Sequence, residues 1–280
     1  MPDIMVVFVV GLLGVLAGGL VNILADDLPQ RRAPRLPRYP DGTLRPALAW
    51  LGITAFLLGK HTSPQGARLS WRHPLSEGLT ALGMLVALLS TADIANRDTL
   101  QLAFWLIYVA IFALVTVIDI EHRLILFVVI IPACLLALVD AAITTATANG
   151  PNPNLQDALL GGGLGLIVTF IMYIGGFVYM YLRFGNQETD EVAFGFGDVT
   201  LTTFCGLVLG WRPLIFALFL AVFLGAVGAF FFLLVGRLRQ GKEYTPLTFI
   251  PYGPYIVAGT LIMLLFSSEF SQFLLRAAYG

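Results

Sequence analysis

The 280-residue sequence contains little charge, two cysteines and three histidines. Asp, Glu, Lys and Arg make up 12% of it, about half the usual share in soluble domains, whereas 58% is hydrophobic and the mean hydropathy is +0.86. That balance excludes a soluble globular protein. A net charge of −1, with no basic patch interleaved with aromatics, gives no argument for nucleic-acid binding, so we expect no nucleic-acid partner. Cys134 and Cys205 lie in apolar runs, so we expect buried thiols and neither a disulfide nor a metal site there.

Long apolar runs indicate an all-α, polytopic membrane protein with about eight transmembrane helices. A helix needs about 20 apolar residues to cross a bilayer. The predicted spans cover residues 4–25, 75–92, 100–118, 124–143, 158–182, 199–211, 213–236 and 251–266. The first run lacks the basic start and the cleavage site of a signal peptide, so we expect it to be retained. Residues 46–58 are too short to span and indicate an interfacial or re-entrant segment.

The basic residues predict the orientation, because loops rich in Lys and Arg stay in the cytoplasm. With the N-terminus outside, the inner side receives all of the 16 Lys and Arg residues except Arg97, Arg212 and Arg276. The same orientation puts the span ends that carry Asp119 and Asp198 at the cytoplasmic face. We therefore expect these two acids to share one membrane depth.

Asp119 and Asp198 are the candidate catalytic residues. Each lies at the edge of an apolar run, where an ionisable group is costly and therefore indicates function. If the fold brings them together, they form an aspartyl pair that shares one proton, so that one carboxyl acts as base and the other as acid. Structural alternatives stay open: Asp119 could pair with Arg123, four residues on, and Asp198 could cap a helix.

Four segments form an ordered set of motifs. The segment around Asp198 reads FGFGDVTLTTFCGLVLGW, and the segment around Asp119 reads IDIEHRLI. The other two read LSWRHPLSEGLTAL and FIPYGPYIVAG. Together they resemble the motifs of the type IV prepilin peptidases, a branch of the GxGD intramembrane aspartyl proteases. The resemblance extends from GLVNILADDLP near the start of the sequence to Tyr252.

This resemblance implies an endopeptidase of the bacterial plasma membrane that cuts the basic leader from prepilin or pseudopilin substrates at the cytoplasmic face. It implies that Asp119 and Asp198 are the catalytic pair, that the lipid bilayer surrounds the protein and that the peptidase needs no cofactor. The substrate-binding residues that it implies are Gly195, Phe196, Gly197, Pro251 and Gly253. Because they lack a Cβ atom, Gly195 and Gly197 would allow strained backbone close to a substrate strand.

Three positions depart from the family pattern. Leu126 and Phe127 stand where the family usually carries proline and then Asn or Asp, and Thr200 replaces a lysine. Neither carboxylate is lost, so we expect the peptidase chemistry to be retained. Local geometry and substrate binding are the properties that these positions affect.

The first cytoplasmic loop departs further. Many family members carry two Cys-x-x-Cys pairs there, a spacing suited to zinc, whereas this loop has no cysteine. His61 stands where one cysteine would be and His73 replaces a tyrosine, but we expect no metal site. Many members also methylate the new N-terminus. Gly59, Lys60 and Glu77 occupy matching positions, so S-adenosylmethionine is the expected cofactor if that activity is retained.

We predict two regions along the chain. Residues 1–92 form a degenerate zinc- and methyltransferase-like region, made of the first helix, the basic loop and the second helix. Residues 93–280 form the GxGD peptidase domain.

The remaining acids suggest supporting roles. Asp140 lies inside the fourth span, where we expect it to pair with a buried neighbour or to face a wet cavity. Glu188, Asp190 and Glu191 precede the GxGD motif and could attract the basic leader of a substrate.

Two other functions stay open. A protease of the presenilin or signal-peptide-peptidase type would share the GxGD motif, but the basic first loop and the IPYGP segment favour the prepilin branch. A small proton- or cation-coupled transporter would use Asp119, Asp140 and Asp198 as a relay. Transporter sites usually lie near the membrane midplane, whereas Asp119 and Asp198 are predicted at one face.

Overall fold

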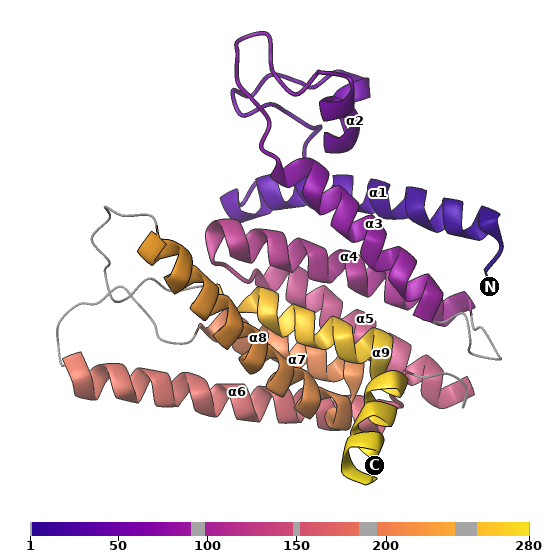
Figure 1. Cartoon of the computed structure of the whole chain (residues 1–280), viewed down its shortest axis with the longest axis vertical. Helices are drawn as coiled ribbons and strands as arrows, with labels where there is room; N and C mark the ends of the chain where they lie inside the picture. The colour runs from indigo at the N-terminus through magenta and orange to yellow at the C-terminus, as the bar shows by residue number, and fades with distance from the viewer. Residues whose placement is uncertain (1, 91–98, 148–151, 185–194, 239–250, 280) are drawn as a thin grey trace. The chain divides into compact units, whose positions relative to one another are not determined.

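The computed structural model describes residues 2–90, 99–147, 152–184, 195–238 and 251–279 (Figure 1). These residues form helices and turns, with no β-strand apart from two isolated bridges in one loop. The predicted all-α class is therefore confirmed. The chain divides into two compact units, Met1–Leu124 and Ile125–Gly280. These units are defined by their internal packing and not by function. The predicted functional division after residue 92 therefore stays a prediction.

The first unit is built on three long helices. They are α1 (Ile4–Asp27), α3 (Arg72–Ser90) and α4 (Thr99–His122). Each packs against the other two. At Gly14 and Gly18 of α1, an added Cβ would overlap with the backbone of Ala81 and Glu77 on α3. Small residues allow this close approach of helix backbones in lipid.

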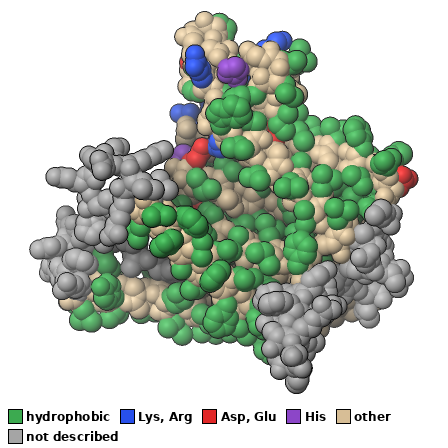
Figure 2. Space-filling model, in the orientation of Figure 1, with side chains coloured by type: hydrophobic (Ala, Val, Ile, Leu, Met, Phe, Trp, Pro, Cys, Tyr) green, Lys and Arg blue, Asp and Glu red, His purple; other side chains and the backbone are tan. Residues whose placement is uncertain are grey.

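The first loop, residues 28–71, connects α1 to α3. It contains the short helices η1 (Leu28–Gln30), η2 (Ala47–Ala49) and α2 (Gly52–Leu57). Two hairpin turns close at the bridges Arg38↔Leu44 and Thr62↔Arg68. A small core formed by Tyr39, Ala49, Ala55 and Leu69 holds the loop together. On the face that Figure 2 shows, Lys and Arg side chains gather on this loop, while hydrophobic side chains cover the helices.

The second unit is arranged around one short helix. Its elements are α5 (Phe127–Thr147), α6 (Leu155–Phe184), α7 (Phe196–Leu209), α8 (Trp211–Leu238) and α9 (Gly253–Tyr279). α7 contacts all four of the others, and Val199, Leu201 and Phe204 on it are fully buried. Gly210, with φ +76°, separates α7 from α8. The start of α7, which carries Asp198, is therefore held by the core of this unit.

Each of the eight predicted spans corresponds to one helix of the described chain. The segment expected to be interfacial contains the six-residue helix α2. Five of the eight helices are long and apolar enough to cross a membrane: α1, α4, α5, α6 and α8. α7 and the first part of α9, Gly253–Phe266, are shorter apolar helices. α3 falls outside both groups because polar side chains, including Ser76, Glu77 and Thr80, occupy its buried face. The exact number of crossings and the orientation stay predictions.

Candidate active site

Asp119 lies in the last turn of α4 and is only 5% exposed. The helix ends at His122, because Arg123 adopts a left-handed conformation (φ 54°) from which its N–H donates to the Asp119 carbonyl oxygen at 2.9 Å. Arg123 is thus past the end of the helix. Whether its side chain pairs with that of Asp119 stays open.

Asp198 is the third residue of α7 and lies in its first turn. Its Oδ2 accepts a hydrogen bond from the Gly195 N–H at 3.3 Å, while its own N–H donates to the Gly195 carbonyl oxygen at 3.1 Å. The sequence predicted a helix that begins after this acid, but α7 already begins at Phe196. Asp198 therefore does contribute to the helix cap, and the cap fixes how its carboxylate is oriented.

The neighbours of Asp198 in the motif are held by packing. Gly195 has φ −79°, and neither Gly195 nor Gly197 has a positive φ. The strained backbone expected at these glycines is therefore wrong. A Cβ on Gly197 would lie 2.8 Å from Cβ of Ile125, so the missing side chain allows Ile125 to pack closely against Gly197. The exposed Phe196 ring lies 5.7 Å from the Tyr173 ring, edge-on.

The FIPYGPYIVAG segment lies in the same unit as Asp198, at the start of α9. Pro251 is half-buried and Gly253, the first residue of the helix, is buried. Between them, Tyr252 lies within electrostatic reach of the Asp198 carboxylate. Tyr252 is thus a candidate site residue that the sequence analysis did not name. It was visible within the FIPYGPYIVAG segment, where only its neighbours were assigned a role.

The three departures from the family pattern each take part in local structure. The Leu126 carbonyl accepts the N–H groups of Val129 and Ile130 and so begins α5. Phe127 contributes a ring 6.1 Å from that of Phe196. The Thr200 hydroxyl donates to the Gly197 carbonyl at 2.8 Å. Two of the three therefore lie directly against the motif that carries Asp198.

The polar residues singled out in the first unit have structural partners. Glu77 is fully buried, and its two oxygens accept the N–H groups of Gly52 and Ile53 at 2.6 and 2.8 Å, at the start of α2. His73 Nδ1 lies 3.2 Å from the Ser70 carbonyl, and its Nε2 faces two arginines. A cation beside those guanidinium groups would be repelled, so His73 does not fit a metal site. Across the described residues, no group of three or more His, Cys, Asp or Glu could hold a metal ion.

The other acids divide into one that the structure describes and three that it does not. Asp140 is buried in α5, where its Oδ2 accepts a hydrogen bond from Asn152 at 2.6 Å. This is the pairing expected of an acid inside a span. Glu188, Asp190 and Glu191 lie outside the described residues.

The second unit thus brings Gly195, Phe196, Gly197, Asp198 and Tyr252 to the start of α7. Asp119 belongs to the first unit. That the two carboxyl groups come within reach of one bridging water stays a prediction.

Known proteins resemble the chain over most of its length. It is 27% identical over 239 residues to the prepilin leader peptidase/N-methyltransferase of Bacillus subtilis, a match that covers 85% of this chain and 84% of that one. The protein of the same name from Aeromonas salmonicida is 28% identical, over 82% of this chain and 68% of its own. That of Pseudomonas aeruginosa is 26% identical, over 81% and 69%. No solved structure matches the chain.

The family comparison favours a leader peptidase over the transporter and the presenilin-type protease. The type IV leader peptidase family matches residues 106–230, a segment that includes both Asp119 and Asp198. The all-α membrane architecture, this match over less than half of the chain and the curated relatives together support a multi-pass membrane peptidase that is similar to the type IV leader peptidases.

Proposed function

We propose that the protein removes the leader of prepilin-type proteins at the cytoplasmic face of the bacterial plasma membrane, with Asp119 and Asp198 as its catalytic pair. The observation that carries this proposal is the family match over residues 106–230, because it contains both acids at helix ends. The family and the names of its relatives point to prepilin-type substrates. The distribution of basic residues supports the cytoplasmic placement.

The pair would hydrolyse the peptide bond without a metal. One carboxylate takes a proton from water, and the water oxygen bonds to the carbonyl carbon of the scissile bond. The other carboxyl donates its proton to the leaving nitrogen as the C–N bond breaks. One proton is taken up and one is released, so the pair is again singly protonated, and transfer of the proton from the former base back to the former acid restores the starting state.

The helix ends suggest which acid takes which role. Asp198 lies in the first turn of α7, where the N-terminal end of the helix dipole stabilises negative charge. Asp119 lies in the last turn of α4, at the opposite end of its helix dipole. We therefore assign Asp198 as the carboxylate that activates water and Asp119 as the proton donor.

Co-expression with a prepilin-like protein, followed by mass measurement of its N-terminus, tests the proposal. Asp119→Asn and Asp198→Asn should each lower cleavage by on the order of 10²–10⁴, because an amide cannot exchange the proton. Both variants should still insert in the membrane, since removing a charge there relieves a cost.

Glu121→Gln is the matched control on the same helix. Glu121 pairs with Arg72 at 2.5 Å and its side chain is 34% exposed, so its carboxylate is already engaged in an ion pair. We expect this variant to keep most of the activity. An inactive Glu121→Gln together with an active Asp119→Asn would show that the first catalytic acid is assigned to the wrong residue.

The names of the relatives also include an N-methyltransferase activity. Of the matching residues in this chain, Glu77 presents no free carboxylate, because both of its oxygens accept backbone N–H groups. We therefore propose the peptidase without a methylation step. The same mass measurement checks this, because S-adenosylmethionine-dependent methylation would add one methyl increment to the cleaved product.

A further inference from the structure

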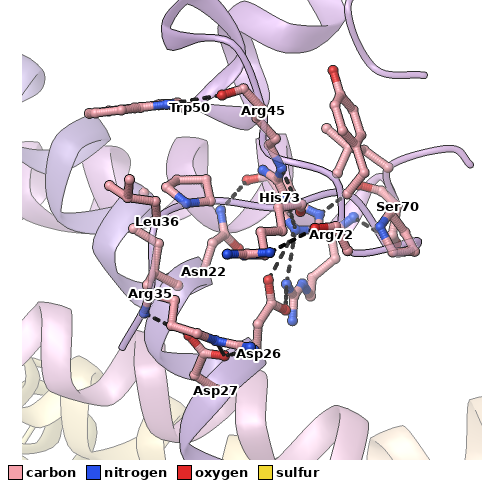
Figure 3. Close-up of a pocket in the computed structure, with 18 of the residues that line it drawn as sticks. Asn22, Asp26, Asp27, Arg35, Leu36, Arg45, Trp50, Ser70, Arg72 and His73 are labelled. Carbon is pink, nitrogen blue, oxygen red and sulfur yellow. Dashed lines mark hydrogen bonds and ion pairs between the residues drawn. The ribbon is translucent and has the colours of Figure 1, made fainter. Parts of the chain in front are cut away.

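A polar cavity of about 440 Å³ lies in the first unit, at the end of α1 (Figure 3). The end of α1, the first loop, the start of α3 and the end of α4 line it. Six arginines contribute to its wall: Arg32, Arg35, Arg38, Arg45, Arg68 and Arg72. The acids on the wall are Asp26, Asp27 and Glu121. The cavity therefore has an excess of positive charge.

Arg45 is the most buried of these arginines, with 6% of its surface exposed. Its Nε donates to the Arg38 carbonyl at 2.8 Å and its Nη2 to His73 Nε2 at 2.9 Å. No carboxylate in the described part of the chain forms an ion pair with it. Burial holds the pKa of Arg45 below its usual value, yet a guanidinium stays charged in proteins. Asp26 and Glu77 act on this charge without direct ion-pair contact, and a buried charge that lacks a direct ion pair is costly.

Arg72 has unused hydrogen-bonding capacity in the same place. Its terminal nitrogens pair with Asp26 and Glu121, but its Nε is buried and has no hydrogen-bond partner among the described residues. Its Nη2 also lies 3.1 Å from His73 Nε2, the atom that Arg45 approaches. Figure 3 shows the two arginines and His73 converging beside Asp26. The positive charges of Arg45 and Arg72 therefore lie close together, and Arg72 has a buried N–H group without a hydrogen-bond acceptor among the described residues.

We propose that this cavity binds a phosphate-type anion through Arg45 and Arg72. Such an anion offers several acceptor oxygens, which suit the fork of a guanidinium, and its charge would compensate Arg45. A free phosphate and the headgroup of an anionic phospholipid share this chemistry. The leader of a substrate is basic and would be repelled here, so the site is separate from leader cleavage.

Thermal unfolding of the full chain in a maltoside detergent tests the proposal. Sodium phosphate should raise the Tm in a saturable way beyond sodium chloride of equal ionic strength, because a ligand that binds only the folded state stabilises it. A parallel arm uses nanodiscs of phosphatidylglycerol against nanodiscs of phosphatidylcholine. A response to inorganic phosphate identifies a free anion as sufficient, and a response to phosphatidylglycerol alone identifies the headgroup. If neither phosphate nor phosphatidylglycerol raises the Tm, the proposal is overturned.

Three variants locate the effect. Arg45→Gln should raise the phosphate concentration that gives half of the Tm shift at least tenfold. Arg72→Lys keeps the charge and removes the Nε donor, so it should weaken the response while the fold without phosphate is preserved, even if Arg45→Gln does not fold. Arg31→Gln removes an arginine of the same loop that does not line the cavity, and its response should equal that of the unmodified chain. Equal losses in Arg31→Gln and Arg72→Lys would overturn the proposal.

Discussion

The helix pairs α1–α3 and α6–α7 both meet through glycines, but the two contacts are secured differently. In the first unit, buried side chains reinforce the glycine contact: the Asn22 amide donates to the His73 carbonyl at 3.1 Å and to Glu77 Oε1 at 3.2 Å, and its oxygen accepts the Ser76 hydroxyl at 2.7 Å. In the second unit, backbone lies against backbone. A Cβ on Gly161 or Gly206 would overlap with the facing glycine, and one on Gly165 would lie 2.6 Å from the Thr202 carbonyl oxygen.

The α1–α3 and α6–α7 contacts differ because each positions a different part of the molecule. Glu77 joins α3 to both α1 and the start of α2, so the polar network fixes the register of the helix pair and anchors the first loop. The α6–α7 contact instead positions a short apolar helix whose first turn carries Asp198. We expect the first unit to be sensitive to changes of polarity and the second to changes of volume.

The largest effect should come from adding volume to the second contact. In Gly161→Ala the new methyl group would overlap with the backbone at Gly206 and Gly210, which should cost more than about 3 kcal/mol because backbone cannot move aside as a side chain can. Thermal unfolding and leader cleavage measure it, and both should be impaired. Gly163→Ala is the matched control, because its methyl group meets nothing within 4 Å. Equal stability of the two variants would contradict this account of the contact.

A change of polarity should have the next largest effect, in the first unit. In Glu77→Gln one carboxylate oxygen becomes an NH₂ group that faces a backbone N–H of α2, so a buried donor loses its acceptor. The expected loss is about 1–3 kcal/mol. Hydrogen exchange at Gly52 and Ile53 measures it directly, since their amides should lose protection. Full protection of both amides in the variant would show that Glu77 does not hold α2.

The helices were largely predictable because apolar runs are a local signal. The predicted span 100–118 falls within α4, and 124–143 overlaps most of α5. The positions of Asp119 and Asp198 near helix ends followed from where those runs stop. The start of α7 was less predictable, because glycines in the GxGD segment are typical of a turn, whereas α7 begins within it at Phe196.

Contacts between distant residues could not be predicted from the sequence. Glu77 was considered for a cofactor because of its position in a motif, but two backbone amides 24 and 25 residues away occupy its oxygens. The arginines of the first loop served only to predict orientation. Their convergence on one cavity depends on how residues 28–71 fold, and no periodic pattern encodes that fold.

A smaller effect should follow from acidifying the first loop. The Asp41 carboxylate accepts hydrogen bonds from the Ser63 hydroxyl, which joins the two hairpins, and from Thr43. These bonds, first that of Ser63, hold the pKa of Asp41 below its ordinary value of 3.8. A lowered folded pKa means that the stabilisation is present above 3.8 and is lost as the pH falls through the folded value. Hydrogen exchange at the Thr43 amide should show protection that falls only in that acidic range.

Asp41→Asn sharpens this test. The amide keeps the size of the side chain and removes its charge, so protection at Thr43 should already be reduced at neutral pH and should no longer depend on acid. A variant that keeps the same acid-dependent loss would show that another group controls the hairpins.

The smallest expected effect is that of metal removal. The first loop lacks the cysteine pairs that the resemblance leads one to expect, and its two hairpins are joined by the Asp41–Ser63 hydrogen bond and the core around Tyr39 and Leu69. Dialysis against EDTA should therefore leave both the Tm and leader cleavage unchanged. The sensitive point is His61, whose buried Nδ1 has no hydrogen-bond partner within the described residues. If EDTA abolishes cleavage and zinc restores it, His61→Ala should remove the zinc dependence, and the loop would then be held by a metal after all.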